Sequence, residues 1–435
     1  MGIIEDREKR TRWFLSDRFG MFIHWGLYAI PARGEWIRSF EKISKEDYME
    51  YFHEFNPVNF DPKAWARAAR NAGMKYAVMT AKHHDGFCLF DSALTDFKST
   101  NTKFRRDFIR EYLEAFRSEG IKAGLYYSII DWNHDDYPAF GDRFHPMRDN
   151  ESYKGRQHNF NNYLDYMHGQ VRELCTNYGK IDIIWFDFSY DDMKCERWRA
   201  TELTNMVRSL QPDIIIDNRL EGAGDGYGSI ISSSPELYSG DFASPEQIIP
   251  PEGVTDSAGN PVPWEACVTL NNSWGYNSSD KTYKSPKLII RKLVECVSKN
   301  GNMLLNVGPN AKGEIPEESL AILSQIGRWM KLNGESIYGC CKAEFPKPEW
   351  GYYTQKGKLL YAHVFDGNIG PLPLIGLKGK IKNVRLLSDG SEIKLIDSWN
   401  TKIYDSESFI NFGSEGSLTY PLPDEIDTVV QLELL

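Results

Sequence analysis

One aspartate, Asp187, stands at the end of an apolar run, where a charge is costly. The run reads Ile183-Ile-Trp-Phe-Asp-Phe188. A carboxylate next to buried apolar residues is expected either to have a charged or hydrogen-bonding partner or to have a catalytic role. Capping of a following helix, or pairing with an arginine, would explain Asp187 equally well from position alone. The other reactive residues along the chain favour the catalytic role.

Two carboxyl groups together can cleave a glycosidic bond, one as the nucleophile and the other as the acid that protonates the leaving oxygen. The nucleophile must stay ionised, whereas the acid must hold its proton near neutral pH. With Asp187 as one member, the second is expected in the loop-rich stretch after the fifth predicted strand. The candidates there are Glu236, Asp241, Glu246 and Glu265. Each alone is an ordinary loop carboxylate, so the residues leave this choice open.

Three histidines, His24, His83 and His84, are neutral donors and acceptors suited to sugar hydroxyls. Zinc is a weaker interpretation, because adjacent histidines on a strand point to opposite faces and no HxH or HxxxH pattern occurs. Satisfied core histidines would explain one of the adjacent pair better than both. We therefore expect no metal.

Aromatic residues are numerous, with 12 Trp, 23 Tyr and 23 Phe. Aromatic rings stack on the apolar faces of sugars, but large cores also collect them. Candidate sugar platforms are Trp25, Trp36, Trp132 and Trp274. The last lies in Asn271-Asn-Ser-Trp-Gly-Tyr276, a polar context that suits a binding loop better than a packed helix.

Helices of ten or more residues alternate with short apolar strands, which is the pattern of parallel βα units. The expected strands are 20–24, 75–80, 121–127, 181–186, 213–217 and 302–307, and the expected helices are 62–72, 107–119, 160–177, 196–210, 286–299 and 316–332. So many units favour a (β/α)8-like TIM barrel over an open sheet. Barrel enzymes carry their chemistry at the carboxyl ends of the strands. The reactive residues fall there: His24, His83, His84, Tyr126, Asp187 and Arg219.

The pattern changes after about residue 340. Strands are expected at 357–365, 379–388, 391–398, 407–412 and 427–434, with no long helical period between them. Short strands separated by turns predict an antiparallel β-sandwich. The predicted division is a catalytic barrel at 1–340 and a C-terminal β-sandwich at 341–435.

The formal net charge of -10 argues against nucleic acid as a partner. No run of about 20 apolar residues predicts a transmembrane helix, so no membrane partner is expected. Seven cysteines with no CxxC pair suggest free thiols in a reducing compartment. As the sequence stands, with no signal peptide seen, we expect a cytoplasmic protein, or an extracytoplasmic one if a signal was removed. A homo-oligomer is compatible with the sequence.

The chain resembles glycoside hydrolase family 29, the retaining α-L-fucosidases, over residues from about 12 to 335. The segments that carry the resemblance keep the family's order and spacing: Arg18-Phe-Gly-Met-Phe-Ile-His-Trp-Gly26, Gly34-Glu-Trp36, Ala81-Lys-His-His-Asp-Gly-Phe87, Gly124-Leu-Tyr-Tyr-Ser128, Trp185-Phe-Asp187, Trp264-Glu265, Ser273-Trp-Gly-Tyr276 and Gly301-Asn-Met-Leu-Leu-Asn-Val-Gly-Pro309. The resemblance implies hydrolysis of terminal α-L-fucosyl residues of oligosaccharides or glycosides, with retention and without a cofactor.

The resemblance also implies residue roles. The family's nucleophile falls on Asp187, and the Ser-Pro-Glu-Gln segment favours Glu246 as the acid/base residue, with Glu236 and Glu265 as alternatives. The residues implied to bind the sugar are His24, Glu35, Trp36, His83, His84, Tyr126, Arg219 and Trp274.

Two other functions fit the same residues. One is a different retaining exo-glycosidase on the same barrel, such as an α-galactosidase. The other is a non-catalytic fucose-binding protein, against which the intact Asp187 argues. A metal-dependent hydrolase is a remote third, testable with a chelator.

Overall fold

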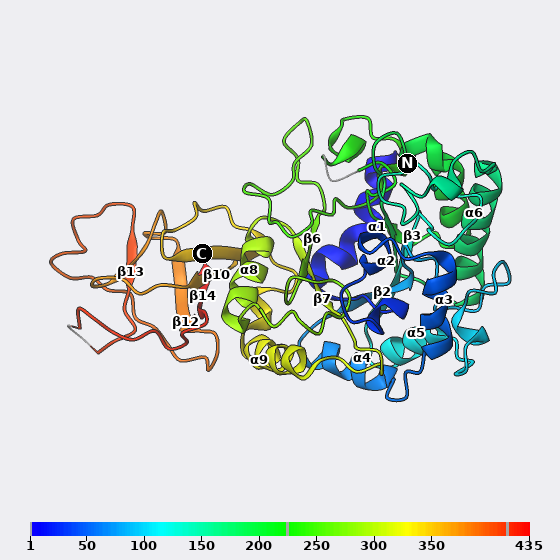
Figure 1. Cartoon of the computed structure of the whole chain (residues 1–435). Helices are drawn as coiled ribbons and strands as arrows, with labels where there is room; N and C mark the ends of the chain where they lie inside the picture. Colours follow the sequence, from blue (N-terminus) through cyan, green and yellow to red (C-terminus); the bar gives the residue numbers. More distant parts are fainter. Residues whose placement is uncertain (1, 223–225, 415–416) are drawn as a thin grey trace.

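The structure is a computed structural model that describes residues 2–222, 226–414 and 417–435. It has two parts, a large helix-covered sheet and a smaller domain of β-strands at the opposite end (Figure 1). Among the described residues, no helix combines the length and the apolar character needed to cross a membrane.

The large part is built on a seven-stranded parallel sheet of order β5-β4-β3-β2-β1-β7-β6. Nearly every residue of these strands is buried, as expected for parallel strands covered on both faces. The strands are β1 (Phe19–Ile23), β2 (Tyr76–Lys82), β3 (Lys122–Ser128), β4 (Ile183–Asp187), β5 (Ile215–Ile216), β6 (Glu265–Thr269) and β7 (Asn302–Val307).

An irregular segment, residues 241–247, closes this sheet into a barrel between β5 and β6. Single parallel bridges join Phe242 to Asp217, Ala243 to Trp264 and Glu246 to Cys267. The segment thus takes the place of the missing strand, and the predicted (β/α)8-like barrel is confirmed. The sequence did not predict the segment or β6, because neither is followed by a helix before residue 286.

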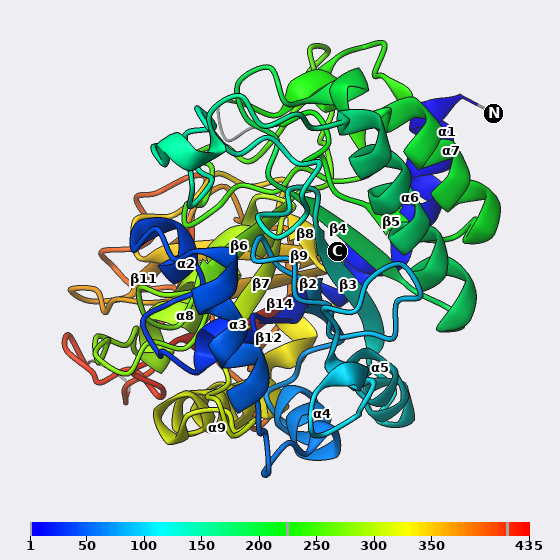
Figure 2. The same cartoon turned by 45° about the vertical axis from the view of Figure 1, so that its right-hand side comes forward.

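Nine α-helices lie in the described residues, mostly around the outside of the barrel (Figure 2). Side-chain caps start several of them where the sequence predicts a helix: Asp61 accepts from the backbone of Ala64, and Asp107 from that of Arg110. The helices are α1 (Ile3–Asp17), α2 (Ile37–Phe40), α3 (Lys45–Glu54), α4 (Pro62–Asn71), α5 (Phe108–Ser118), α6 (Phe160–Asn177), α7 (Ala200–Leu210), α8 (Pro286–Ser298) and α9 (Glu317–Asn333).

Helix α1, which the sequence analysis did not predict, packs under the amino ends of the strands. Its Phe14 contacts Tyr76 of β2 and Phe242 of the closing segment. The floor of the barrel is therefore apolar, and the opposite end is left free for a site.

The C-terminal domain has an antiparallel sheet of order β12-β14-β10-β9-β8 and a two-stranded sheet β11-β13. Leu360 and Val430 of the first sheet share a core with Leu372 and Ile410 of the second, which makes a sandwich. The strands are β8 (Cys341–Lys342), β9 (Gly351–Lys356), β10 (Leu359–Val364), β11 (Leu372–Leu374), β12 (Ile381–Leu386), β13 (Ser408–Ile410) and β14 (Thr428–Leu434).

One strand predicted in this domain, 391–398, is wrong. Only isolated bridges form there, from Glu392 to Arg385 and from Leu395 to Ile410. The alternating pattern is present, but the chain crosses between the two sheets, so no continuous ladder develops. Strand β9 was not predicted.

Candidate active site

A small pocket of about 120 Å³ opens at the carboxyl ends of the barrel strands. Seven of the residues predicted to form the site line it, together with Asp187 and Glu246. Its lining consists of Phe22, His24, Glu35, Trp36, His83, His84, Tyr126, Trp185, Asp187, Phe188, Glu246, Cys267 and Trp274.

Asp187 is the last residue of β4, and its carboxylate is held on both oxygens. The Tyr126 hydroxyl donates to Oδ2 at 2.8 Å, and Arg219 Nη1 lies 3.3 Å from Oδ1. The next residue, Phe188, has φ 89°, a strained value for a bulky side chain. The chain therefore turns sharply after Asp187, and the carboxylate ends at the pocket instead of continuing the strand.

Burial raises the pKa of Asp187 to about 6, because a charge is disfavoured away from water. Arg219 and the Tyr126 hydroxyl oppose this rise, while the negative charge of Glu246 adds to it. The side chain is 14% exposed. Asp187 thus stays ionised at neutral pH but titrates near the working range of an enzyme.

Arg219 joins the two carboxylates of the pocket. Its Nη2 lies 3.1 Å from Glu246 Oε2, and its Nη1 contacts Asp187. Ser244 holds the guanidinium from behind, accepting from Nε at 2.9 Å through its hydroxyl and from Nη2 at 3.0 Å through its carbonyl. Two nitrogens of one planar group thus fix how far apart the carboxylates lie.

Glu246 lies on the barrel-closing segment and is more open than Asp187, with 43% of its side chain exposed. Gln247, which follows it, has φ 55° and binds Thr269 of β6 through its side chain. Each carboxylate is therefore followed by a residue of positive φ. One carboxylate is buried at the base of the pocket and the other lies nearer its mouth.

His83 and His84 both line the pocket, contrary to the expectation that adjacent histidines point to opposite faces. Strand β2 ends at Lys82, and its register against β3 shifts between Thr80 and Lys82. The histidines therefore lie in the turn beyond the strand, where alternation no longer applies, and their ring centroids are 4.1 Å apart.

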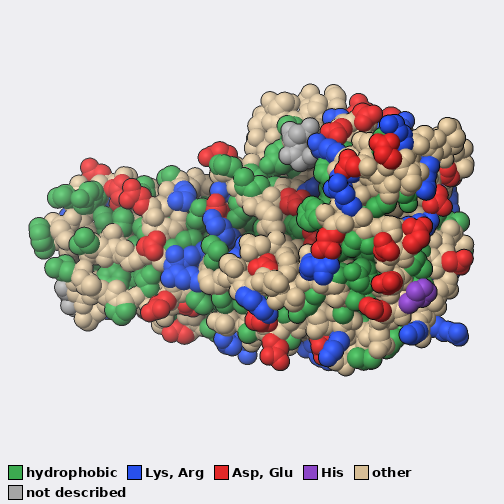
Figure 3. All heavy atoms as spheres, in the orientation of Figure 1, with side chains coloured by type: hydrophobic (Ala, Val, Ile, Leu, Met, Phe, Trp, Pro, Cys, Tyr) green, Lys and Arg blue, Asp and Glu red, His purple; other side chains and the backbone are tan. Residues whose placement is uncertain are grey.

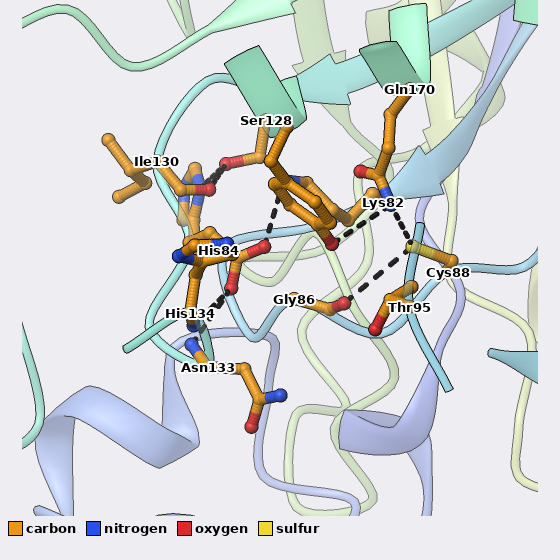
Figure 4. Close-up of polar contacts among 12 residues, drawn as sticks. Lys82, His84, Gly86, Cys88, Thr95, Ser128, Ile130, Asn133, His134 and Gln170 are labelled. Carbon is orange, nitrogen blue, oxygen red and sulfur yellow. Dashed lines mark hydrogen bonds and ion pairs between the residues drawn. The ribbon is translucent and has the colours of Figure 1, made fainter. Parts of the chain in front are cut away.

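Hydrogen bonds fix which ring nitrogen of His24 and His84 carries the proton. The Ser128 hydroxyl donates to the Ile130 carbonyl, so its oxygen accepts from His84 Nδ1 at 2.7 Å (Figure 4). Asn306 likewise donates its amide to the Trp274 carbonyl, so its Oδ1 accepts from His24 Nδ1. Both Nε2 atoms are then free to accept from ligand hydroxyls.

Burial keeps these rings neutral. It lowers the pKa of His24 to about 3, with the Asn306 hydrogen bond opposing the shift. It also holds the pKa of His84 well below its usual value, and the positive charge of Lys82 adds to this effect. Nδ1 of His83 is buried without a protein partner among the described residues. Apart from its carboxylates, the pocket therefore offers uncharged groups to a ligand. Arg219, predicted to bind the sugar, contacts both carboxylates but does not line the pocket.

Glu35 and the tryptophans complete the wall. Glu35 is buried, and its Oε2 accepts from the backbone of Gly275 at 2.8 Å. Trp36 packs against His84, and Trp274 against His24. The two other suggested platforms, Trp25 and Trp132, are core residues outside the pocket lining.

The alternative acids lie elsewhere. Glu265 is at the amino end of β6, bonded to the Tyr76 hydroxyl near the barrel floor, and burial raises its pKa to about 8. Asp241 is paired with Arg10 and Arg208. Glu236 is exposed and lies outside the pocket lining. Of the four carboxyl groups considered, only Glu246 shares the pocket with Asp187.

Sequence reasoning missed the residues that support the site, above all Ser128, Ser244 and Asn306. They bind the histidines and Arg219 but do not line the pocket. Ser128 and Asn306 lie at the carboxyl ends of strands, where barrel enzymes carry their active sites, so their positions in the sequence could have indicated them. No group of three or more His, Cys, Asp or Glu side chains that could hold a metal ion occurs among the described residues.

A closed barrel with two arginine-bridged carboxylates at its strand ends, in a pocket of neutral hydroxyl-binding groups and aromatic rings, is the arrangement of a glycoside hydrolase. The comparisons with known proteins narrow this class. The model of the family described as Alpha-L-fucosidase matches residues 4–335. The chain belongs to this family, as the resemblance predicted.

Known alpha-L-fucosidases are similar to most or nearly all of the chain. Tissue alpha-L-fucosidase of Rattus norvegicus is 30% identical over 383 residues, which cover 82% of this chain and 76% of that one. Alpha-L-fucosidase isoenzyme 1 from Paenibacillus thiaminolyticus is 63% identical with a TM-score of 0.95, and the match covers 99% of this chain and 100% of that one.

A second similar structure is a trapped covalent intermediate of the GH29 alpha-L-fucosidase from Bacteroides thetaiotaomicron. It was obtained with 2-fluoro-fucosyl fluoride and a Glu-to-Gln mutant. It is 31% identical with a TM-score of 0.83, and the match covers 98% of this chain and 96% of that one.

Proposed function

We propose that this protein is a retaining exo-α-L-fucosidase in which Asp187 is the nucleophile and Glu246 the acid/base residue. The observation that carries the proposal is the bridge of Arg219 between these two carboxylates in one small pocket. A nucleophile and an acid on either side of one anomeric carbon are what double displacement requires. The trapped intermediate of the Bacteroides relative supports the same mechanism.

In the first step, an Asp187 oxygen attacks C1 of the fucosyl residue and the bond to the leaving oxygen breaks. Glu246 gives its proton to that oxygen. In the second step, Glu246 takes a proton from water, the water oxygen attacks C1, and the ester bond to Asp187 breaks. Two inversions leave the configuration retained.

The other pocket groups would bind the sugar. The free Nε2 atoms of His24 and His84 and the Glu35 carboxylate accept from hydroxyls, since fucose carries several donors. The aromatic rings of Phe22 and Trp185 offer an apolar surface suited to its C6 methyl group. A pocket of about 120 Å³ suits a single terminal residue, which supports exo action on a fucosylated oligosaccharide or glycoside.

Replacement of the nucleophile tests the first role. Asp187→Gly is expected to lower kcat for an aryl α-L-fucoside by about a thousandfold or more, because no other group can form the ester. Azide, as a small external nucleophile, should partly restore turnover and give the β-fucosyl azide. Turnover close to that of the wild type would contradict the proposal.

The acid/base role is tested by leaving-group dependence. Glu246→Gln should slow substrates with a poor leaving group by roughly 10²–10⁴-fold, but slow a dinitrophenyl fucoside far less in the first step. Glu236→Gln is the matched control and should behave as the wild type. If Glu236→Gln instead shows the leaving-group effect, the roles of the two residues are reversed.

Two assays separate the rival functions. Comparison of an aryl α-L-fucoside with an aryl α-D-galactoside distinguishes a fucosidase from a galactosidase on the same barrel. Fucose binding without any turnover would indicate a non-catalytic protein. Light scattering would decide whether the enzyme acts as one chain or as the homo-oligomer that the sequence allows.

We also infer a reducing compartment such as the cytoplasm. All seven cysteines lie in described residues, and each is a free thiol. Labelling of thiols in freshly lysed cells would test this inference.

A further inference from the structure

Beside the catalytic pocket lies a second cavity, of about 400 Å³, formed by α2, the start of α3 and the loop between β3 and α6. Trp132 separates the two. Its ring is 5.3 Å from that of Trp36 and 5.4 Å from that of His84, and it also lines the second cavity. The two cavities are therefore neighbours, with Trp132 packed between them.

The cavity is lined by a buried arginine, Arg38, that forms no ion pair with the described residues. Arg38 is 1% exposed, and only Nη1 makes a hydrogen bond, to the Asp85 carbonyl. Burial lowers the pKa of Arg38, and the charges of Asp85 and Asp131 oppose this shift, although neither carboxylate forms an ion pair with Arg38. A buried charge without an ion-pair partner is strongly unfavourable. A buried arginine of this kind is therefore a candidate for binding an anionic ligand.

Neighbouring donors are also unused. Arg38 Nε and Trp132 Nε1 are both buried without a hydrogen-bond partner among the described residues. Both side chains line the cavity. Arginine and tryptophan side chains carry hydrogen-bond donors and no acceptor, so this wall of the cavity favours a ligand with acceptor oxygens.

The charged groups that line the cavity also favour an anionic ligand. They are three cations, Arg38, Lys45 and Arg156, and one carboxylate, Asp135, which pairs with Lys45 at 2.9 Å. Burial lowers the pKa of His134, and that of His145 to about 3, so these lining histidines are neutral. A cavity with excess positive charge is unexpected on a chain of net charge -10 and favours an anion.

We propose that this cavity is a subsite for an oxyanion, a sulfate ester or a carboxylate, carried by the sugar to which the fucosyl residue is attached. The proposal rests on the proposed fucosidase function, because the fucosyl residue would occupy the neighbouring pocket. The chain connects the two cavities at the start of α2: Glu35 and Trp36, just before this helix, line the catalytic pocket, and Arg38 within it lines the second cavity.

The test uses three fucosyl disaccharides of one linkage, with a neutral, a sulfated or a uronic acid residue next to fucose. The wild type should cleave the sulfated or the acidic one with a kcat/KM roughly tenfold or more above that of the neutral one, mainly through KM. The two anionic substrates distinguish the two sources of the oxyanion. Ionic strength is held constant, because salt screens exposed charges.

Two variants assign the preference to the cavity. Arg38→Met and Arg156→Ala should each remove most of the preference while leaving turnover of an aryl fucoside unchanged. Arg156 is exposed, so its replacement tests the proposal even if the Arg38→Met protein fails to fold. Lys63→Ala, which removes a cation from the exposed face of α4, is the control and should keep the preference.

The possible outcomes separate a failure of the anion subsite from a failure of the proposed fucosidase function. Equal kcat/KM for all three disaccharides, or a preference that survives in both cavity variants, would overturn the anion subsite. Failure to cleave even the aryl fucoside would instead contradict the proposed function, so the two failures are distinguishable.

Discussion

Asp187 lies among groups that act on its charge in opposite directions. Burial disfavours the ionised form, and Glu246 adds to this effect. Arg219 and Tyr126 stabilise the ionised form. The balance leaves a pKa of about 6, close enough to neutrality that protonation of this one residue should limit activity.

The pH dependence of the enzyme follows from this balance. In the proposed mechanism a protonated Asp187 cannot attack C1, so kcat/KM should fall as the pH drops below about 6. Arg219→Gln removes the cation that lowers this pKa, and the acidic limb should then move to higher pH. The measurement is kcat/KM for an aryl fucoside between about pH 4 and 8.

Arg67→Gln provides the control for this experiment. Arg67 lies on α4 and pairs only with the exposed Asp61 among the described residues, so its replacement should leave the limb in place. An acidic limb that stays fixed or moves to lower pH in Arg219→Gln would show that another group controls it.

At the scale of elements, a buried ion pair ties the end of β2 to the loop after β3. Lys82 Nζ, on the side chain labelled in Figure 4, lies 3.0 Å from Asp131 Oδ2, and both side chains are buried. Asp131 Oδ1 accepts from the backbone of Asn133 and His134. Gly86, with φ +84°, permits this approach, since an added Cβ would lie 2.3 Å from Asp131 Oδ1. His84 and Ser128 are thereby held at one end of the barrel.

Loss of this pair should be costly. Lys82→Met leaves Asp131 charged and buried without its cationic partner, so the free energy of unfolding should fall by about 3–5 kcal/mol. Denaturant unfolding measures this change. The double variant Lys82→Met/Asp131→Asn keeps the acceptor for the loop backbone and removes both charges, so it should lose less. A single variant within 0.5 kcal/mol of the wild type would contradict a structural role for the pair.

At the scale of the whole molecule, the barrel and the sandwich share one hydrophobic core. Tyr361 and Val429 of the sandwich belong to the main cluster of the barrel. Trp329 of α9 donates through Nε1 to the Asp427 carbonyl, and Arg291 of α8 binds the carbonyls of Phe365 and Ile426. The two parts should therefore unfold together.

This interface can be tested with two tryptophans. Trp329→Ala should lower the stability of the whole chain by about 3–5 kcal/mol, seen in calorimetry as one transition shifted to lower temperature. The sandwich end also exposes apolar side chains (Figure 3), including Trp399, which is 87% exposed. Trp399→Ala should change stability by less than about 0.5 kcal/mol. Two separate transitions in the wild type would rule out a shared core.

The sequence by itself determined the helices and most barrel strands, because periodicity and caps are local. The helix predicted at 160–177 is α6 (Phe160–Asn177), and the strand predicted at 302–307 is β7. It also identified the pocket residues that follow strand ends, since parallel strands bring their carboxyl ends together.

Only the tertiary structure decided which carboxylate faces Asp187. Glu236, Asp241, Glu246 and Glu265 all occur within one irregular stretch, where no local period indicates the direction of a side chain. The closing segment is positioned by bridges to Asp217 and Cys267, which lie well before and well after it in the sequence. Those long-range contacts put Glu246 beside Arg219 and leave the other three carboxyl groups outside the pocket.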